Sequence, residues 1–377
     1  MDGPRVARPD DLPGIIDLAE HVFCDLEGLP RTMARRFPLT LSEANADNLY
    51  IVTERGRPVS LIAADLRTFV TAGCRIPSGL VGAVCTHEAY RGCGHAGSLL
   101  ALAYERMRAK GVLLVWISGR RRLYLSSGAT PVWPHHAARA DINRLEPAAD
   151  ASLQADPITA DNLHDLAALQ AAEPVRFEWP GDWLKRVPLS WLTPPIGAGW
   201  LIRRGGPPVA AVCLRQPDAR TGACDIMECL GDSAAALAAL PVLARSMGAS
   251  SVTAWFTSYD GRTASLMERA GFEVTRIAPS HRTHKVLNFA GLLDALRPHL
   301  ERTLARDAGA LTATDNGLRI AISGLEYVSP DEATAVKMIF ALPDEYEDRR
   351  AEMPPAVRDL LGRAMPVRLR HYGLNYV

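Results

Sequence analysis

A short glycine-rich turn, Arg91-Gly-Cys-Gly-His-Ala-Gly97, joins an apolar run to the start of a helix. The run before it, residues 79–84, has the continuous apolar character of a buried strand, and residues 97–110 show the helical spacing of apolar side chains. A helix that begins directly after glycines presents backbone N–H groups that have no intrahelical partner, and its dipole adds partial positive charge. The turn therefore predicts an anion-binding loop, most simply for a phosphate, between a strand and a helix.

Length and composition limit the classes of protein to which the chain can belong. With 377 residues it exceeds a single ordinary core, which predicts about two or three domains. Lys+Arg and Asp+Glu each total 42, so the chain has no net positive charge that would attract nucleic acid or an anionic membrane. No apolar run reaches the ~20 residues needed to span a bilayer, and the first residues lack a signal-peptide pattern. The seven cysteines are scattered without a C-x-x-C spacing, which argues against disulfides or a zinc site and favours a reducing cytoplasm.

The order of predicted elements occurs twice along the chain. Each copy begins with a strand and a helix, continues through alternating strands and a second helix, and ends with a buried strand and a short helix. The ends of the two copies, residues 123–129 and 266–272, can be laid side by side. This pattern predicts an α/β (α+β) fold with mixed sheets flanked by helices. We place the domain boundaries at 1–148, 149–288 and 289–377, with a linker within 146–154.

The last predicted domain differs from the two copies in the order and type of its predicted elements. Residues 289–306 are predicted to form one amphipathic helix, because leucines recur there at helical spacing. Residues 317–323 and 335–341 are predicted to be alternating strands. The chain then ends in a proline-containing, aromatic tail.

The spacing Arg91-x-x-Gly94-x-Ala96 resembles the pyrophosphate loop of the GNAT superfamily of acyl-CoA-dependent N-acyltransferases. The whole layout resembles the Eis (enhanced intracellular survival) type of aminoglycoside N-acetyltransferase. That resemblance implies an active GNAT domain, a degenerate second GNAT domain and a sterol-carrier-like C-terminal domain. The chain departs from the family at Ala89 and Tyr90, where the family has more arginines.

The resemblance implies which residues hold acetyl-CoA. They form two groups, one in the strand before the turn and one in the turn itself: Gly82, Ala83 and Val84, and Tyr90, Arg91, Gly92, Cys93, Gly94, His95 and Ala96. A backbone N–H of the strand would stabilise the charge on the thioester oxygen, and the pantetheine amides would pair along the strand edge.

Two catalytic residues follow from the same resemblance. Tyr124 would protonate the departing thiolate, and the α-carboxylate of Val377 would accept the proton of the amine. The plainer interpretations are a core aromatic for Tyr124 and an ordinary packed C-terminus for Val377. In the second copy, Asp232 would repel a pyrophosphate and Met267 stands where the first copy has Tyr124, so that copy is expected to have lost the cofactor.

Other polar side chains near the turn have plainer interpretations. His87, Glu88 and His95 border the loop in a position to relay protons, but exposed loop polarity explains them as well. His135 and His136 have no partner at metal-ligand spacing, so we expect a surface position for them and no metal.

Two functional hypotheses remain at this stage. The first is a cytoplasmic, homo-oligomeric acetyl-CoA-dependent N-acetyltransferase that acts by direct transfer on a small-molecule amine, such as an aminoglycoside or another amine antibiotic. Neither nucleic acid nor a membrane is expected as a partner. The second is a non-catalytic protein that binds an acyl-CoA or a lipid. A survey of thiol release with acetyl-CoA and assorted amines would separate them.

Overall fold

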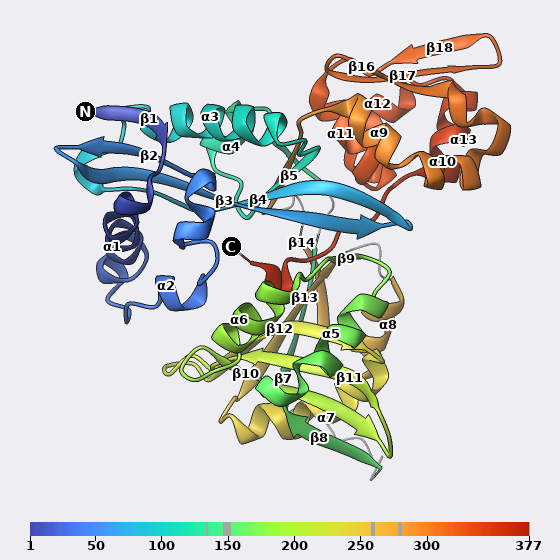
Figure 1. The fold of residues 1–377 in the computed structure, drawn as a ribbon. Coiled ribbons are helices and arrows are strands. Elements are labelled where there is room, and N and C mark those ends of the chain that lie inside the picture. The colour runs from blue at the N-terminus through green and yellow to red at the C-terminus, as the bar shows by residue number, and fades with distance from the viewer. Residues whose placement is uncertain (133–134, 146–151, 258–260, 278–280, 377) are drawn as a thin grey trace. The chain divides into compact units, whose positions relative to one another are not determined.

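The computed structural model describes residues 1–132, 135–145, 152–257, 261–277 and 281–376. The chain forms two compact units, which are treated separately below (Figure 1).

The first unit consists of Met1–Trp133, Pro279–Leu369 and Tyr376–Val377. Strands of its large sheet follow the order β1-β2-β3-β4-β5-β15-β6. Their bounds are β1 (Asp2–Val6), β2 (Leu49–Glu54), β3 (Arg57–Thr71), β4 (Cys74–Thr86), β5 (Leu114–Ile117), β6 (Thr130–Pro131) and β15 (Thr283–Val286). The helices that accompany this sheet are α1 (Leu12–Phe23), α2 (Met33–Arg36), α3 (His95–Ala109) and α4 (Arg122–Ser126).

The second unit consists of Pro134–Ala278 and Arg370–Asn375. Its sheet follows the order β14-β7-β13-β12-β11-β10-β8. The strand bounds are β7 (His135–Asp141), β8 (Leu153–Pro157), β10 (Gly197–Arg204), β11 (Pro208–Arg215), β12 (Ala223–Gly231), β13 (Ser251–Thr257) and β14 (Glu273–Ile277). The helices are α5 (Leu163–Ala172), α6 (Gly181–Trp191), α7 (Ser233–Ser246) and α8 (Gly261–Arg269).

The two sheets have the same strand order, which confirms the predicted fold class of mixed sheets flanked by helices. In each sheet one internal pair is parallel, β4 with β5 in the first unit and β12 with β13 in the second. The other pairs along both sheets are antiparallel. Because the pairing agrees strand by strand, β12 is the counterpart of β4 and α7 is the counterpart of α3.

One strand of each unit comes from the part of the chain that the sequence assigned to the other. β15 falls within the predicted second domain, yet it lies between β5 and β6 in the first sheet. β7 falls within the predicted first domain, yet it lies between β13 and β14 in the second sheet. The strand pairing thus does not follow the boundaries predicted at 148/149 and 288/289, and the division into three domains stays a prediction.

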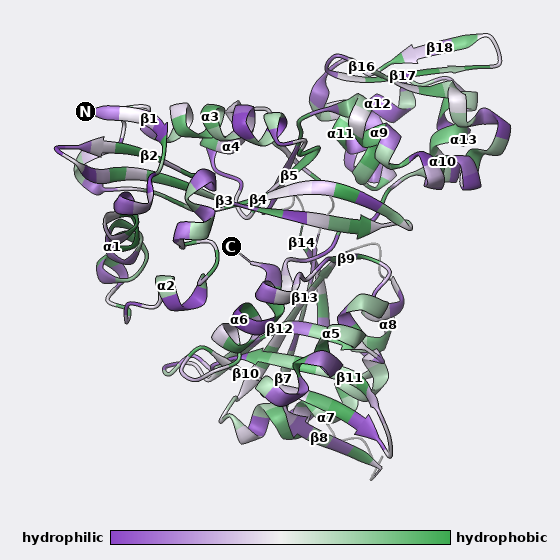
Figure 2. Cartoon of the chain, viewed as in Figure 1, coloured by the Kyte–Doolittle hydropathy of each residue, from purple (hydrophilic) through white to green (hydrophobic). Residues whose placement is uncertain are grey.

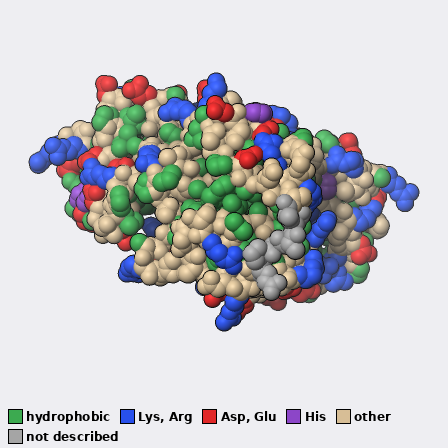
Figure 3. All heavy atoms as spheres, turned by 90° about the horizontal axis from the view of Figure 1, so that it is seen from below, with side chains coloured by type: hydrophobic (Ala, Val, Ile, Leu, Met, Phe, Trp, Pro, Cys, Tyr) green, Lys and Arg blue, Asp and Glu red, His purple; other side chains and the backbone are tan. Residues whose placement is uncertain are grey.

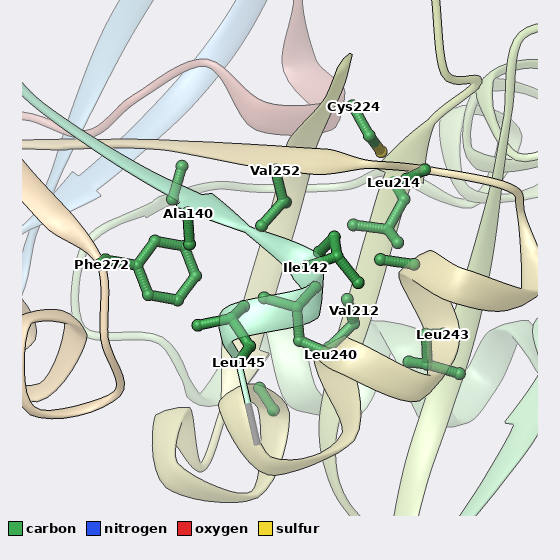
Figure 4. Packing of buried hydrophobic residues seen from close by; sticks show 14 of the residues in the cluster. Ala140, Ile142, Leu145, Val212, Leu214, Cys224, Leu240, Leu243, Val252 and Phe272 are labelled. Atoms are coloured by element: carbon green, nitrogen blue, oxygen red, sulfur yellow. The ribbon is translucent and has the colours of Figure 1, made fainter. Parts of the chain in front are cut away.

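The core of the second unit shows that β7 is fully part of it. Ala140 of β7 and Ile142 directly after it lie among Val252, Phe272 and neighbouring buried side chains (Figure 4). The inner strands of both sheets, such as β3 and β11, are largely hydrophobic, as expected of strands covered on both faces (Figure 2).

The C-terminal part of the first unit departs from two predictions. It contains α9 (Phe289–Ala295), α10 (Arg297–Leu304), β16 (Leu311–Thr314), β17 (Gly317–Ile322), β18 (Leu325–Val328), α11 (Glu332–Phe340), α12 (Glu347–Ala351) and α13 (Pro355–Ala364). The helix predicted over 289–306 is broken into α9 and α10, because Pro298 occupies the first turn of α10, where a missing N–H is tolerated.

The strand predicted over 335–341 is wrong, since these residues belong mostly to helix α11. The side chain of Asp331 accepts a hydrogen bond from the backbone N–H of Thr334 at 2.6 Å and so caps the helix. The adjacent buried residues Val336, Met338 and Ile339 then pack from a helical face rather than from alternating strand positions. The sterol-carrier-like character of this segment stays a prediction.

Charged side chains of both signs are spread over the face of the molecule drawn in Figure 3, in keeping with the formal net charge of +0. Within the described parts of the chain, no helix combines the length and the apolar character needed to cross a membrane.

Candidate active site

Strand β4 carries a bulge at the residues predicted to contact the thioester. Ala63 of β3 lies opposite Gly82, whereas Leu61 lies opposite Cys85, so β4 contains one extra residue between these pairs. Ala83, which lies there, has φ of 45°, in the left-handed region. A bulge of this kind bends the strand and re-aims its backbone groups.

The other edge of β4 opens at the same place. β4 pairs in parallel with β5 only from Ser78 to Val81, whose partners are Leu114 to Ile117. Beyond Val81 no described strand continues the pairing on this edge. The bulged residues therefore border a strand edge that an extended ligand can join by backbone hydrogen bonds.

The glycine-rich loop leads from the end of β4 into α3. Gly92 and Gly94 both have φ of 81°, a conformation that glycine adopts without strain, and a Cβ at either position would meet no atom within 4 Å. The guanidinium Nε of Arg91 donates a hydrogen bond to the carbonyl of Thr86 at 3.1 Å, which folds the loop back onto β4. Gly94 is the N-cap of α3, and it offers no side chain to cap the first amides. These amides are thus left for a ligand.

The corresponding helix of the second unit begins differently. β12 ends at Gly231 and α7 begins at Ser233, so no glycine-rich loop separates them. The carboxylate of Asp232 accepts hydrogen bonds from the N–H groups of Ala234 and Ala235, at 2.9 and 3.3 Å. The positions that an anion would use at this helix are therefore already filled by a negative side chain.

Tyr124 lies in α4 and is 6% exposed. Its ring is so close to Gly119 that a Cβ on this glycine would be 2.9 Å from Cε2 of the tyrosine. Burial raises the pKa of Tyr124 above its ordinary value; the charge of Arg121 lowers it, and that of Tyr376 raises it. The hydroxyl is therefore neutral at physiological pH, the form that can donate a proton.

The three predicted segments meet around one core. Tyr124 belongs to a buried cluster with Leu99 and Leu100 of α3, and partly buried Val84 and Tyr90 pack against that cluster. The bulge, the loop and the tyrosine are thus brought together, although the sequence places them in separate elements.

The chain end also belongs to the first unit. The ring of Tyr376 contacts that of Phe37, with a centroid separation of 6.3 Å, and Tyr376 is close enough to Tyr124 to influence its pKa. Val377 lies outside the described residues, so its predicted role stays a prediction.

His87 and Glu88, which border the loop, contact a histidine that sequence reasoning missed. The Nε2 of His21 in α1 lies 3.1 Å from a carboxylate oxygen of Glu88, and its ring stacks on that of His87 with centroids 5.0 Å apart. Glu88 accepts a hydrogen bond from its own backbone N–H and lies beside these histidines, which lowers the pKa of its carboxyl. Ligand atoms of the three residues lie within 4.8 Å of one another, and all three side chains are partly exposed.

The prediction that His135 lies on the surface is wrong. It is 3% exposed, because it begins β7 within the second sheet, and its ring contacts that of His371. His136 is partly buried, and burial lowers the pKa of its imidazole. Sequence reasoning also missed Gly119, whose only signal is a glycine between a buried strand and a short helix.

Comparisons with known proteins agree with this geometry. Residues 4–132 match a family described as an acetyltransferase (GNAT) domain. Comparison with the sequences of curated proteins gives no match.

Solved structures share the fold over nearly the whole chain. A GCN5-related N-acetyltransferase from Anabaena variabilis superposes with a TM-score of 0.67 at 14% identity, covering 97% of this chain and 98% of that one. One from Kribbella flavida gives 0.64 at 16% identity, with 99% and 97% covered. Eis1 from Mycobacterium abscessus gives 0.58 at 12% identity, with 88% and 91% covered.

Proposed function

Because residues 4–132 are a GNAT acetyltransferase domain, we propose that this N-acyltransferase moves an acetyl group from acetyl-CoA directly onto a small-molecule amine. One observation carries the proposal. In the first unit the glycine loop leaves the start of α3 uncapped beside a bulged, open strand edge, whereas Asp232 closes the corresponding helix of the second unit. We therefore propose that the donor binds in the first unit.

The donor would bind through main-chain groups. The amides of Tyr90 to Ala96 would hold the pyrophosphate, helped by the dipole of α3. The pantetheine arm would lie along Gly82 to Val84, where no described strand continues the pairing on the β5 side of β4. A backbone N–H at the bulge would then face the thioester oxygen and stabilise the charge that develops there.

The acetyl group would pass directly from the donor to the acceptor while both are bound, without a covalent intermediate on the enzyme. The amine nitrogen attacks the thioester carbon, the carbonyl electrons move onto oxygen, and the C–S bond breaks as the carbonyl forms again. The α-carboxylate of Val377 accepts the proton from the amine nitrogen, and Tyr124 donates its proton to the departing thiolate. The products are an acetamide and free coenzyme A.

The resemblance to the Eis type supports a cationic acceptor such as an aminoglycoside or another amine antibiotic, and a cytoplasmic homo-oligomer. The first test is a thiol-release assay with acetyl-CoA and a panel of aminoglycosides, polyamines and simple amines. Release of coenzyme A that depends on the amine supports the proposal. Saturable binding without release across the panel would instead favour a non-catalytic acyl-CoA-binding protein.

Placing a carboxylate at the start of α3 should imitate the second unit. In Gly94→Asp we expect the affinity for acetyl-CoA to fall about tenfold to a hundredfold, the loss that ~1–3 kcal/mol of charge repulsion produces. Gly94→Asn is the matched control, because asparagine has the same shape, tolerates positive φ and lacks the charge. Isothermal titration with coenzyme A measures the difference, and equal affinities in the two variants would contradict a pyrophosphate site here.

A methyl group at Gly119 should displace the ring of Tyr124. With its Cβ 2.9 Å from Cε2, Gly119→Ala is expected to lower kcat about tenfold and leave the KM for acetyl-CoA unchanged, because misplacing a catalytic group costs turnover. Gly309→Ala serves as the control, since a Cβ there meets open space in the same unit. Unchanged kcat in Gly119→Ala would show that the position of Tyr124 does not matter for turnover.

The pH profile should reflect the raised pKa of Tyr124. The acid acts in its neutral form, which persists below the pKa, and burial places that pKa above 10.0. We therefore expect any alkaline loss of kcat that depends on this residue to occur at a higher pH than the ionisation of an ordinary tyrosine. A decline at lower pH that is present in the wild type and absent in Tyr124→Phe would contradict the assignment.

A further inference from the structure

Three side chains that can donate to a metal ion meet beside the turn that precedes the glycine-rich loop. His21 comes from the last turn of α1, and His87 and Glu88 follow the end of β4. Their ligand atoms all lie within 4.8 Å of one another. Within the described parts of the chain, no other group of three histidine, cysteine or carboxylate side chains meets so closely.

The distances within this group suit a small divalent ion. Nε2 of His21 lies 3.2 and 3.1 Å from the two carboxylate oxygens of Glu88, and Nδ1 of His87 lies 3.6 Å from one of them. Donor atoms around a tetrahedral Zn²⁺, each about 2.0–2.2 Å from the ion, are ~3.3–3.6 Å apart. The contacts to Glu88 are therefore close to the spacing that an ion between the three side chains would impose.

The second ring nitrogen of His21 faces another carboxylate. Its Nδ1 lies 3.9 Å from Oδ2 of Asp25, and Nε of Arg31 holds that carboxylate in place with hydrogen bonds of 2.9 and 3.2 Å. Histidines that bind metals commonly direct their other N–H toward a carboxylate, which fixes the ring and leaves the remaining nitrogen for the ion. His21 is therefore oriented as a ligand through Nε2.

The ring of His87 presents a lone pair to the same group. Its Nδ1 accepts a hydrogen bond from the backbone N–H of Ala89 at 3.3 Å, so the proton of the neutral ring is on Nε2. This bond is long and Ala89 is exposed, so its N–H can turn to water when an ion takes the lone pair. The rings of His21 and His87 stack with centroids 5.0 Å apart, where two protonated rings would repel each other and two neutral rings can share an ion.

We propose that His21, His87 and Glu88 form a binding site for a divalent transition-metal ion such as Zn²⁺. Two imidazoles and a carboxylate are donors that Zn²⁺ prefers, whereas Mg²⁺ and Ca²⁺ prefer oxygen donors alone. Three protein ligands leave one position of a tetrahedral ion for water. The bound ion would join the end of α1 to the turn that leads into the glycine-rich loop.

Spacing along the chain could not indicate this site. His21 and Glu88 are 67 residues apart, so only the fold brings them together, and the expectation of no metal did not consider them as a pair. The plainer interpretation is that a protonated His21 forms ion pairs with Glu88 and Asp25 and binds no metal. The site does not rest on the proposed function, because it can be tested without acetyl-CoA or an amine.

Calorimetric titration of the untagged, metal-free, full-length protein with ZnCl₂ tests the site. We expect saturable binding of Zn²⁺ and no binding of Mg²⁺ at the same concentrations. His21→Gln, His87→Gln and Glu88→Gln should each weaken Zn²⁺ binding at least ~100-fold, because losing a ligand costs more than losing the carboxylate behind it. Asp25→Asn should weaken it about tenfold.

His164→Gln is the matched control. Nε2 of His164 also lies near a carboxylate, 3.4 Å from Asp165, but these two belong to no group of three ligands among the described residues. Cys93→Ser is the second control, because Cys93 is an exposed thiol in the glycine-rich loop and a thiolate binds Zn²⁺ by itself. The affinity for Zn²⁺ should be the same in both controls as in the wild type.

Thermal unfolding gives an independent readout. An ion that binds only the folded chain raises Tm as its concentration increases. We expect this rise in the wild type and in His164→Gln, and no rise in His21→Gln or His87→Gln. These two variants should fold like the wild type without metal, because both side chains are partly exposed.

A wild-type protein that shows no saturable Zn²⁺ binding would overturn the proposal and leave the ion pairs of His21 as the role of the group. Binding that survives all three ligand replacements would overturn it as well. So would binding that is lost in Cys93→Ser or His164→Gln, since Zn²⁺ would then occupy a different place on the chain.

Discussion

Replacing Tyr124 with phenylalanine is expected to lower kcat by about 10²–10⁴-fold, the usual contribution of a positioned general acid. The ring would keep its packing against Gly119 and the surrounding core, so the fold and the affinity for acetyl-CoA should stay near those of the wild type. Only the proton donor to the departing thiolate is lost. Steady-state kinetics with a thiol reagent, together with titration of coenzyme A, measure the two parameters separately.

Tyr104→Phe is the matched control for this experiment. Tyr104 lies in the same buried cluster, but its hydroxyl makes a hydrogen bond with Oγ of Ser127 at 3.1 Å, and burial raises its pKa to about 12. Its loss should therefore affect stability more than turnover. Equal values of kcat in the two variants would remove Tyr124 from the mechanism.

Converting the terminal carboxylate of Val377 to a carboxamide is expected to lower kcat by about 10²-fold or more, because the amide cannot accept the proton of the amine. The change adds no bulk and leaves the donor site untouched, so the KM for acetyl-CoA should not move. Semisynthesis by ligation of a C-terminal peptide supplies both the amide and the matched free acid, and their kcat values are compared directly.

A simpler version appends a few residues after Val377. The same residues added before Met1, which is 65% exposed, control for the effect of an extension as such. We expect the C-terminal extension to abolish activity and the N-terminal one to leave it intact. Full activity of the C-terminally extended or amidated enzyme would assign the base to another group.

The donor loop could be predicted because its information is local. Arg91, Gly92 and Gly94 set the conformation of a few consecutive residues, and a helix start follows from neighbouring side chains, so the strand, turn and helix appear in the structure where the sequence predicted them. The match of residues 4–132 to a GNAT domain confirms the resemblance drawn from this motif. The same reasoning anticipated Asp232 as the residue that distinguishes the second copy, and the structure adds that it caps α7.

Predictions failed where a local pattern fits two structures. The apolar residues of 335–341 are compatible with a strand, but the cap at Asp331 and the packing of both faces make a helix. His135 looked like a surface residue because nothing near it in sequence indicates burial. Its burial follows from the sheet that β7 joins.

The sequence by itself determined the glycine loop, the mixed α/β character and the loss of the donor motif in the second copy, since each depends on residues that are close along the chain. The tertiary structure alone decided which sheet β7 and β15 join. It also decided the bulge at Ala83 beside an open strand edge and the buried ion pair between Arg370 and Glu228. Strand pairing and burial of charge are set by partners distant in sequence, and the alternation of side chains in a short strand does not specify which sheet completes its hydrogen bonds.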